Sequence, residues 1–159
     1  MKLLLLLRHA RAEREAPDLA DHDRLLDERG RRDATAVGRL LLREGRVPDR
    51  ILSSTALRAC ATAQRAADSC GYEGEVWTSS RLYLADCLKL LGVLRELEPS
   101  CERVLVVAHN PGVAELLQLL TGENRPVPPA ALARVQLSLE SWEQLRTGAR
   151  GRLIDSPES

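Results

Sequence analysis

The chain opens with an unbroken apolar run, Leu3 to Leu7, that ends abruptly in Arg8 and His9. A short apolar run without polar alternation is typical of a strand buried on both faces, as in a parallel sheet. The run is too short to span a bilayer, which needs roughly 20 apolar residues, and no cleavage site of a signal peptide follows it. In open α/β sheets ligands bind outside the carboxyl ends of strands, so Arg8 and His9 stand where such chemistry is expected.

The same patterning predicts four further strands. Short apolar segments predict strands at 50–53, 75–78 and 103–108, and the last of these again lacks alternation. Residues 133–139 instead alternate between apolar and polar positions, which predicts a half-exposed, antiparallel strand. The segment after Trp142 gives no clear pattern, and we expect residues 156–159 to be frayed.

Apolar residues at helical spacing predict four helices between these strands. They lie at 28–45, 56–71, 87–97 and 111–120. We expect Ser53, Ser54 or Thr55 to cap the second helix, and Asn110 to cap the fourth with Pro111 as its first residue. Residues 10–27 are charged and rich in turn formers, and predict a loop with a short helical piece. Strands alternating with helices predict one α/β domain over residues 1–159, a three-layer α/β/α sandwich whose mostly parallel sheet includes an antiparallel strand.

Composition narrows the class of protein. The 159 residues carry 23 Lys and Arg against 23 Asp and Glu, so the chain presents no overall field for nucleic acid or membranes, and we expect neither partner. Lysine occurs only at Lys2 and Lys89, and the guanidinium groups that supply the remaining positive charge match phosphate well. The four cysteines form no C-x-x-C pair, and none has an arginine six residues later, which excludes a thiolate phosphatase loop. We expect them to be reduced, buried thiols of a cytoplasmic protein.

The strand ends predict a phosphate site. Two of the three histidines, His9 and His109, directly follow the two most apolar strands, and Arg58 follows a third strand and its Ser-Ser turn. If these groups converge, Arg8 and Arg58 can hold phosphoryl oxygens through paired, charge-assisted hydrogen bonds, helped by the helix start after Ser53. Nearby like charge keeps an imidazole neutral, so that His9 can attack phosphorus while His109 stabilises the transition state. This chemistry requires no metal and no cofactor.

The segments that carry these residues resemble a known family. Leu6-Leu7-Arg8-His9-Ala10 resembles the Arg-His-Gly signature of the histidine phosphatase superfamily, the phosphoglycerate mutase-like fold, with alanine where glycine is usual. Residues 53–63 resemble its second-arginine segment, and 107–112 its second-histidine segment. The short length, Asp21-x-x-Arg24-x-Leu26-x-x-x-Gly30 and Leu82-Tyr83-x-Ala85 are most similar to the SixA-type phosphohistidine phosphatases.

The resemblance implies that His9 accepts the phosphate and that Arg8, Arg58 and His109 complete the pocket, with Arg24 as a possible addition. It implies a phosphatase whose substrate is phosphohistidine on a phosphorelay protein. Alanine at position 10 should narrow the conformational range of the backbone at the strand exit.

The general acid of the larger family members has no clear counterpart. Asp86 and Glu13 are the nearest candidates, although Asp86 is also placed to cap a helix and Glu13 to be a solvated charge. General acid catalysis contributes about 10²–10⁴-fold for poor leaving groups. Since the imidazole of phosphohistidine leaves more easily than an alkoxide, a site without an acid favours phosphohistidine.

Three alternatives stay open at this point. The same fold can serve a small-molecule phosphomonoesterase or mutase, and the missing acid also allows a module that binds phosphate without turning it over. A metal site built on His9, His109 and a carboxylate is disfavoured by the two arginines, which would repel a cation.

Overall fold

The computed structural model describes residues 1–148 and 151–154 and places all of the strands that it describes in a single sheet. The strand order is β3-β2-β4-β1-β5-β6. β1 to β4 are mutually parallel, β5 runs antiparallel to β1, and β6 runs antiparallel to β5. The strands are β1 (Lys2–Arg8), β2 (Arg50–Ser54), β3 (Val76–Ser79), β4 (Arg103–Ala108), β5 (Leu132–Leu137) and β6 (Gly151–Ile154).

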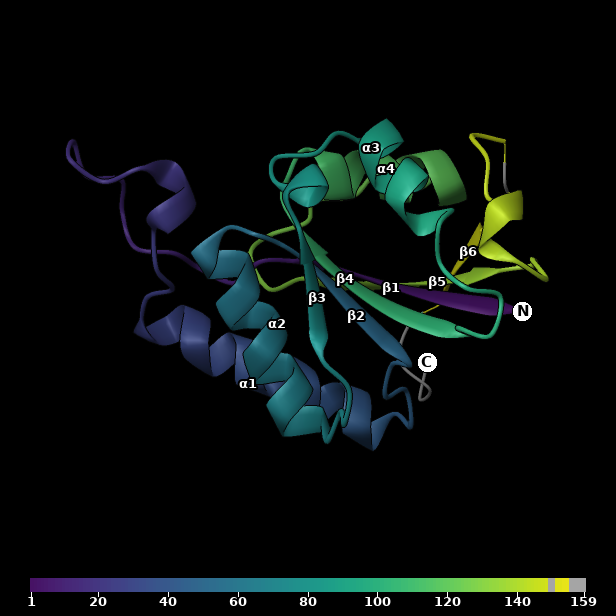
Figure 1. Ribbon diagram of the computed structural model, residues 1–159, viewed down its shortest axis with the longest axis horizontal. Coiled ribbons are helices and arrows are strands. Elements are labelled where there is room, and N and C mark those ends of the chain that lie inside the picture. Colours follow the sequence, from purple (N-terminus) through teal and green to yellow (C-terminus); the bar gives the residue numbers. More distant parts are fainter. Residues whose placement is uncertain (149–150, 155–159) are drawn as a thin grey trace.

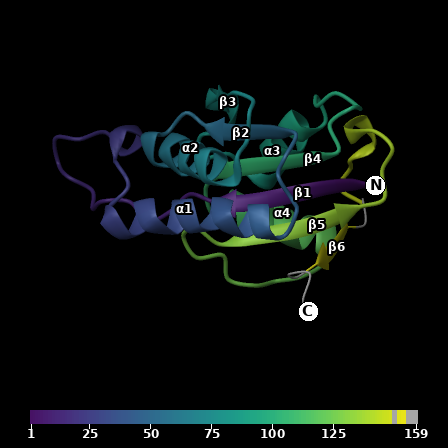
Figure 2. The same ribbon diagram turned by 90° about the horizontal axis from the view of Figure 1, so that it is seen from below.

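Helices cover both faces of this sheet. Figures 1 and 2 show α1 and α2 on one face and α3 and α4 on the other. The helices are α1 (Glu28–Arg43), α2 (Leu57–Cys70), α3 (Cys87–Leu94) and α4 (Gly112–Thr121), with short 3-10 helices η1 (Asp21–Asp23), η2 (Ser80–Leu82) and η3 (Trp142–Gln144). The predicted three-layer α/β/α sandwich is therefore confirmed, as is the antiparallel strand.

The leucine run of β1 occupies the middle of the sheet, paired with β4 on one side and β5 on the other. Successive side chains of a strand point to opposite faces, and here both faces are buried. Leu4 and Leu6 pack into the core beneath α3 and α4, whereas Leu5 and Leu7 pack into the core beneath α1 and α2. Burial on both sides explains why the run lacks polar alternation.

The predicted elements and the observed ones differ mainly at their ends. α3 ends at Leu94, earlier than predicted, and β6 follows Trp142 in a segment where no strand was predicted. β6 is short and begins with a glycine, so its pattern is too weak to stand out. Residues 156–159, which we expected to be frayed, lie outside the described residues.

Two helix starts differ from the predicted ones. The residue before α2 is Ala56, which has no capping side chain; Ser54 Oγ instead accepts the Ala56 N–H, one step ahead of the helix. At α4 the cap position belongs to Pro111, which is therefore not the first helical residue. Asn110 lies before it in a cis peptide bond, and its Oδ1 accepts the N–H of Ala114 in the first turn at 3.3 Å, so the Asn110 side chain caps this turn as predicted, while its amide donates to Val127 O. Ser54, in contrast, is used by the site described below rather than as a helix cap.

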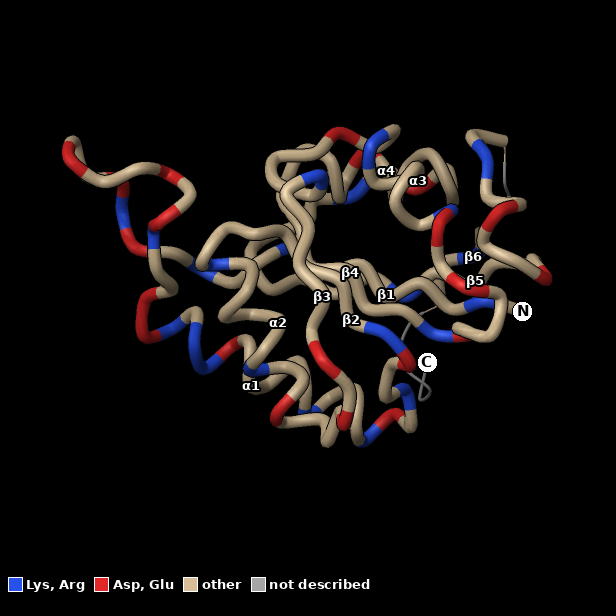
Figure 3. Tube along the Cα trace, in the orientation of Figure 1, with Lys and Arg blue, Asp and Glu red and all other residues tan. Residues whose placement is uncertain are grey.

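The loop of residues 10–27 projects beyond the sheet and returns over the amino-terminal end of α2 (Figure 1). Acidic and basic residues alternate along it and along α1, so no single sign dominates this part of the surface (Figure 3). Its base is fixed by a bridge between Ala12 and Leu26 and by Gly30, where an added Cβ would lie 2.0 Å from Arg11 O. Gly30 thus permits α1 to approach the start of this loop.

The remaining sequence predictions concern the cysteines and the membrane. Cys70 and Cys101 are buried as expected, but Cys60 and Cys87 are only half-buried. Within the described residues, no helix combines the length and the hydropathy needed to cross a bilayer.

Candidate active site

Three strand ends deliver polar side chains to one cavity at the carboxyl edge of the parallel sheet. β1 ends in Arg8 and His9, β2 leads through Ser54 into α2 and Arg58, and β4 leads into His109. Together with residues of the loops, they surround a cavity of about 350 Å³. Its walls are formed by Arg8, His9, Arg11, Ala12, Asp21, Arg24, Arg58, Leu84, His109, Asn110 and Pro129. We call this cavity the cup.

His9 lies in the wall of the cup with only 8% of its surface exposed. Its Nδ1 lies 2.8 Å from Ala10 O, and because a carbonyl can only accept, the ring donates from Nδ1. Burial lowers the pKa of His9 to about 4, and the positive charges of Arg58, Arg8 and Arg24 act in the same direction. The ring is therefore neutral near pH 7, with an unprotonated Nε2.

The backbone next to His9 is held by Thr62 of α2. Ala10 is fully buried, and its N–H donates to Thr62 Oγ1 at 3.0 Å, while that hydroxyl donates to Arg58 O at 2.7 Å. Ala10 is not among the residues with positive φ. Alanine therefore fits at this position, because the backbone does not need the freedom of glycine.

Two arginines offer unpaired donors beside His9. Arg8 Nη1 donates to Val127 O at 3.0 Å. The Nε atoms of Arg8 and Arg58 are buried and have no hydrogen-bond partner among the described residues. Buried N–H groups are rarely left unpaired in proteins, so these donors suit an anion. Arg58 is only 2% exposed, and its position is fixed by Asp21.

Asp21, from η1, is the central carboxylate of the site. Its Oδ2 accepts from Arg58 Nη2 at 2.9 Å and from Tyr83 OH at 2.6 Å, and its Oδ1 accepts from Arg24 Nε and Nη2 at 3.0 and 2.9 Å. The Tyr83 hydrogen bond and the two arginines hold the pKa of Asp21 well below its usual range. The carboxylate is therefore ionised and carries no proton to donate. No role was predicted for Asp21, although it opens the segment Asp21-x-x-Arg24 that resembles the SixA-type phosphatases.

His109 faces His9 across the cup, with the two ring centroids 5.2 Å apart. Its Nε2 lies 2.8 Å from Ser54 Oγ, and its Nδ1 lies 3.4 Å from Arg58 Nη2. Burial lowers the pKa of His109 to about 3, helped by His9 and Arg58. Both imidazoles in the cup are thus neutral near pH 7.

The structure brings together Arg8, His9, Arg58 and His109, and it adds Arg24 to the wall of the cup. It does not bring in the two predicted acids. Asp86 is exposed and accepts the Lys89 N–H as the N-cap of α3, and Glu13 is an exposed residue whose backbone carbonyl accepts from Arg24. Asp21 is the one carboxylate among the described residues that lines the cup.

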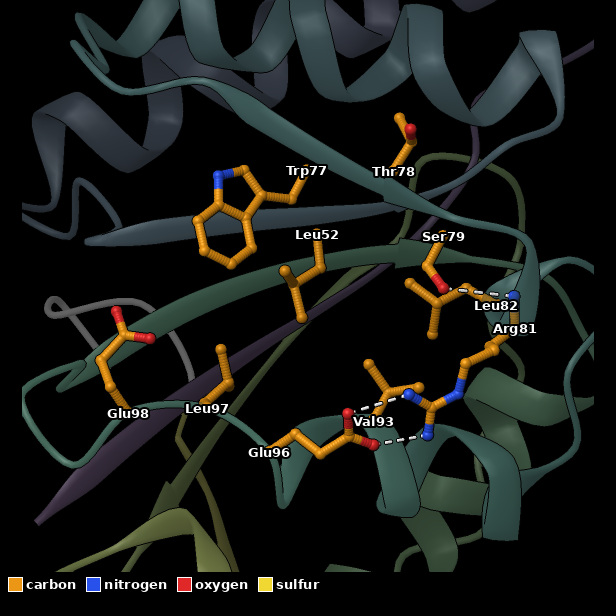
Figure 4. A pocket seen from close by; sticks show the side chains of 10 residues that line it. All are labelled: Leu52, Trp77, Thr78, Ser79, Arg81, Leu82, Val93, Glu96, Leu97 and Glu98. Atoms are coloured by element: carbon orange, nitrogen blue, oxygen red, sulfur yellow. Dashed lines mark hydrogen bonds and ion pairs between the residues drawn. The ribbon is translucent and has the colours of Figure 1, made fainter.

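Other parts of the described chain offer less chemistry. No group of three or more His, Cys, Asp or Glu side chains in residues 1–148 and 151–154 is arranged to hold a metal ion. A second cavity of about 240 Å³ lies between β3 and α3 (Figure 4). Two of its three charged residues, Arg81 and Glu96, pair with each other, with Nη1 and Oε1 2.9 Å apart; the third, Glu98, pairs with Arg50, and Trp77 forms an apolar wall. It contains no histidine or cysteine.

A doubly wound sheet with a cup of two neutral imidazoles and two arginines at its carboxyl edge defines an α/β enzyme that handles phosphate. The model of the histidine phosphatase superfamily (branch 1) matches residues 4–83. An uncharacterized protein of Mycobacterium leprae is 34% identical over 119 residues, covering 73% of this chain and 71% of that protein. The chain belongs to the histidine phosphatase superfamily and is a phosphatase.

Solved structures give a finer likeness. The chain is similar to the Agrobacterium tumefaciens protein assigned as phosphohistidine phosphatase SixA, with a TM-score of 0.83 and 28% identity over 97% of this chain and 96% of the other. It is also similar to the protein histidine phosphatase SixA complexed with tungstate, with a TM-score of 0.80 and 25% identity over 98% and 97% of the two chains. These likenesses place it beside the SixA-type phosphatases.

Proposed function

We propose that this phosphatase removes the phosphoryl group from phosphohistidine on a protein, through a phosphohistidine intermediate on His9. The observation that carries the proposal is the cup itself. Arg8, His9, Arg58 and His109 come from three separate strand ends and line one cavity, in which the only lining carboxylate of the described residues is locked in its ionised form.

In the first step, the lone pair on His9 Nε2 attacks phosphorus as the bond from phosphorus to the substrate imidazole breaks. The Nδ1–H of His9 stays on Ala10 O at 2.8 Å, which holds the ring in place and leaves Nε2 free to react. The departing imidazole takes its electron pair and gains a proton from water. Arg8 and Arg58 offer their unpaired N–H groups to the phosphoryl oxygens, where negative charge is spread in the transition state.

In the second step, water attacks the phosphorus on His9, and Nε2 leaves with its electron pair. The products are inorganic phosphate and the free enzyme. The same cationic walls stabilise this transition state, so each residue serves both halves of the reaction. His109, neutral and facing His9, acts as a hydrogen-bond donor to the phosphoryl group in both steps.

The state of Asp21 supports phosphohistidine as the substrate. An alkoxide leaving group needs a proton, and a general acid that supplies it typically raises the rate about 10²–10⁴-fold. Asp21 has none to give, since Tyr83, Arg24 and Arg58 hold its pKa below the usual range. Transfer from one imidazole to another breaks and forms the same kind of bond, so the first step is close to balanced in energy, and water supplies the proton for the leaving imidazole without a protein acid.

The mouth of the cup supports a protein-borne substrate. Leu84 lines it and leaves 57% of its surface exposed. In the segment from Gly71 to Asp86, β3 and η2 take up residues 76–82, which leaves little chain to form a lid. A phosphoryl group carried on the surface of a phosphorelay protein can therefore enter the cup while its carrier stays outside. The cytoplasmic location expected from the sequence is part of the same proposal.

Comparing substrates tests the proposal. The kcat/KM for a histidine-phosphorylated protein should exceed that for phosphoglycerate or an alkyl phosphate by at least about 10²-fold. This is the lower end of the rate contribution that a general acid usually makes, which the alkoxide leaving group would lack here. His9→Ala should abolish the activity, whereas His22→Ala, outside the cup, should keep it. Comparable or faster hydrolysis of an alkyl phosphate would contradict the phosphohistidine assignment and favour a small-molecule phosphomonoesterase.

A further inference from the structure

Ser54 connects β2 to the site without lining the cup. It is fully buried, and its Oγ lies 2.8 Å from His109 Nε2, on the side of the ring away from Arg58. The same oxygen accepts the N–H of Ala56 at 3.1 Å. The serine side chain is thus used twice, once by the backbone before α2 and once by an imidazole of the site.

The hydrogen bonds of this hydroxyl can be counted. A serine hydroxyl donates once and accepts twice. Ala56 N–H occupies one acceptor position, and His109 Nε2 is the one remaining partner of Ser54 Oγ within residues 1–148 and 151–154. If His109 carried its proton on Nε2, the serine hydrogen would have no acceptor in a fully buried position, which proteins strongly avoid. Ser54 must therefore donate, and His109 Nε2 must accept.

We infer that Ser54 fixes His109 in the tautomer that carries its proton on Nδ1, and so aims a donor at the phosphoryl group in the cup. Which nitrogen of a neutral histidine is protonated follows from the hydrogen bond made by the other one. Ser54 is a positioning residue, because it acts through His109 and does not touch the substrate. The catalytic part of this inference rests on the proposed function, whereas the tautomer is a property of the protein without substrate.

The contact on the other side of the ring is weaker and competes with this assignment. Arg58 Nη2 lies 3.4 Å from His109 Nδ1, and because a guanidinium group can only donate, this contact alone would favour an accepting Nδ1. It is much longer than the 2.8 Å contact with Ser54, and Nη2 makes its shorter hydrogen bond, at 2.9 Å, to Asp21 Oδ2, so the Ser54 contact decides the tautomer. The Nδ1–H therefore has no strong protein acceptor. A phosphoryl oxygen held by Arg58 would supply one, so the donor is kept for the substrate.

Nitrogen-15 NMR of the ligand-free protein tests the tautomer directly. Two-bond correlations between ring protons and nitrogens distinguish the two neutral forms, and the three histidines can be assigned with His9→Ala and His22→Ala. Near pH 7, His109 should show the Nδ1–H pattern in the wild type and the Nε2–H pattern in Ser54→Ala. His9 provides an internal reference, because its Nδ1–H is held by Ala10 O and should not change.

Two further variants separate orientation from packing. Ser53→Ala removes a hydroxyl that is also fully buried but donates to Ser54 O and does not reach His109; it should keep both the tautomer and the activity. Ser54→Thr keeps a hydroxyl and should restore the Nδ1–H form. Ser54→Ala should lower kcat about 10–100-fold, the usual effect of losing a partner that orients a catalytic group.

The outcomes are distinct. An Nε2–H pattern for His109 in the wild type, or an Nδ1–H pattern that persists in Ser54→Ala, would overturn the inference whatever the activity. A tautomer change without a fall in kcat would overturn the catalytic part. If the wild type showed the Nδ1–H form but cleaved no histidine-phosphorylated protein, the proposed function would fail while the assignment of the tautomer stood.

Discussion

Lowering the pH from about 7.5 to about 5.5 should leave the reactivity of His9 nearly unchanged, because its pKa is lowered to about 4. Burial is the main cause, and the charges of Arg58, Arg8 and Arg24 add to it. With an ordinary pKa near 6.5, roughly one tenth of the ring would be neutral at pH 5.5, whereas with a pKa near 4 more than about nine tenths is neutral. The two cases differ about tenfold in the amount of reactive imidazole.

Carbethoxylation by diethyl pyrocarbonate measures this difference without a substrate. The reagent attacks neutral imidazole nitrogen, and peptide mass spectrometry follows the modification of His9 alone. A histidine-containing peptide, treated in parallel, should slow about tenfold over this pH interval. A similar slowing at His9 would show that its ring titrates like an exposed histidine, and would refute the argument that the cup holds the nucleophile neutral.

The same pKa change affects stability. The unfolded chain takes up a proton at this position near pH 6.5, whereas the folded chain does so only near pH 4. Since the unfolded state binds more protons between these values, the free energy of unfolding falls as the pH falls through this window, by on the order of 3 kcal/mol for His9. Urea denaturation at several pH values should show the fall, and His9→Gln should lessen it; an equal fall in the variant would contradict the assignment to His9.

Two substitutions test the supports of the cup. Thr62→Val removes the acceptor of the fully buried Ala10 N–H and should lower the free energy of unfolding, measured by urea denaturation, by about 1–3 kcal/mol. Thr62→Ser keeps the hydroxyl and should be close to wild type. An unchanged urea midpoint in the valine variant would contradict the role of this hydrogen bond. Asp21→Asn removes the charge that pairs with Arg58 and Arg24, and should lower kcat about 10–100-fold in steady-state assays by loosening both guanidinium groups. A rise in kcat would show that the carboxylate restrains the site instead of ordering it.

The architecture and the centre of the cup could be predicted because both follow from local pattern. A leucine run without alternation needs cover on both faces, and parallel strands place their carboxyl ends at one edge. Arg8, His9 and His109 directly follow such strands, so their convergence needs little beyond the strand assignments. Predicting the position of Arg58 required one further inference, namely that the helix after β2 begins at the same edge of the sheet.

The role of Asp21 could not be predicted from pattern. It lies in a charged loop without periodicity, and its contacts with Arg58 and Tyr83 join residues 37 and 62 positions away. Only the path of the loop over α2 brings them together. The sequence instead favoured Asp86 and Glu13 as the general acid, although the first caps a helix and the second is exposed to solvent.

The serines at the end of β2 lie where the sequence predicts them, but Ser54 hydrogen-bonds to His109 and does not cap α2. A serine before a helix usually caps it, whereas Ser54 is directed to an imidazole from another strand. That preference cannot be read from residues 53–58 alone, because it depends on the pairing of β2 with β4, which brings the end of one strand beside the end of the other.

Trapping the phosphoryl group on the enzyme shows directly whether His9 is the nucleophile. The protein is mixed with a histidine-phosphorylated protein carrying labelled phosphate, quenched in base within one turnover, and digested for mapping. We expect acid-labile, base-stable label on the peptide that contains His9, absent from His9→Ala and lost over time as water completes the reaction. Turnover of the substrate with no label on His9, or label that persists in His9→Ala, would contradict it.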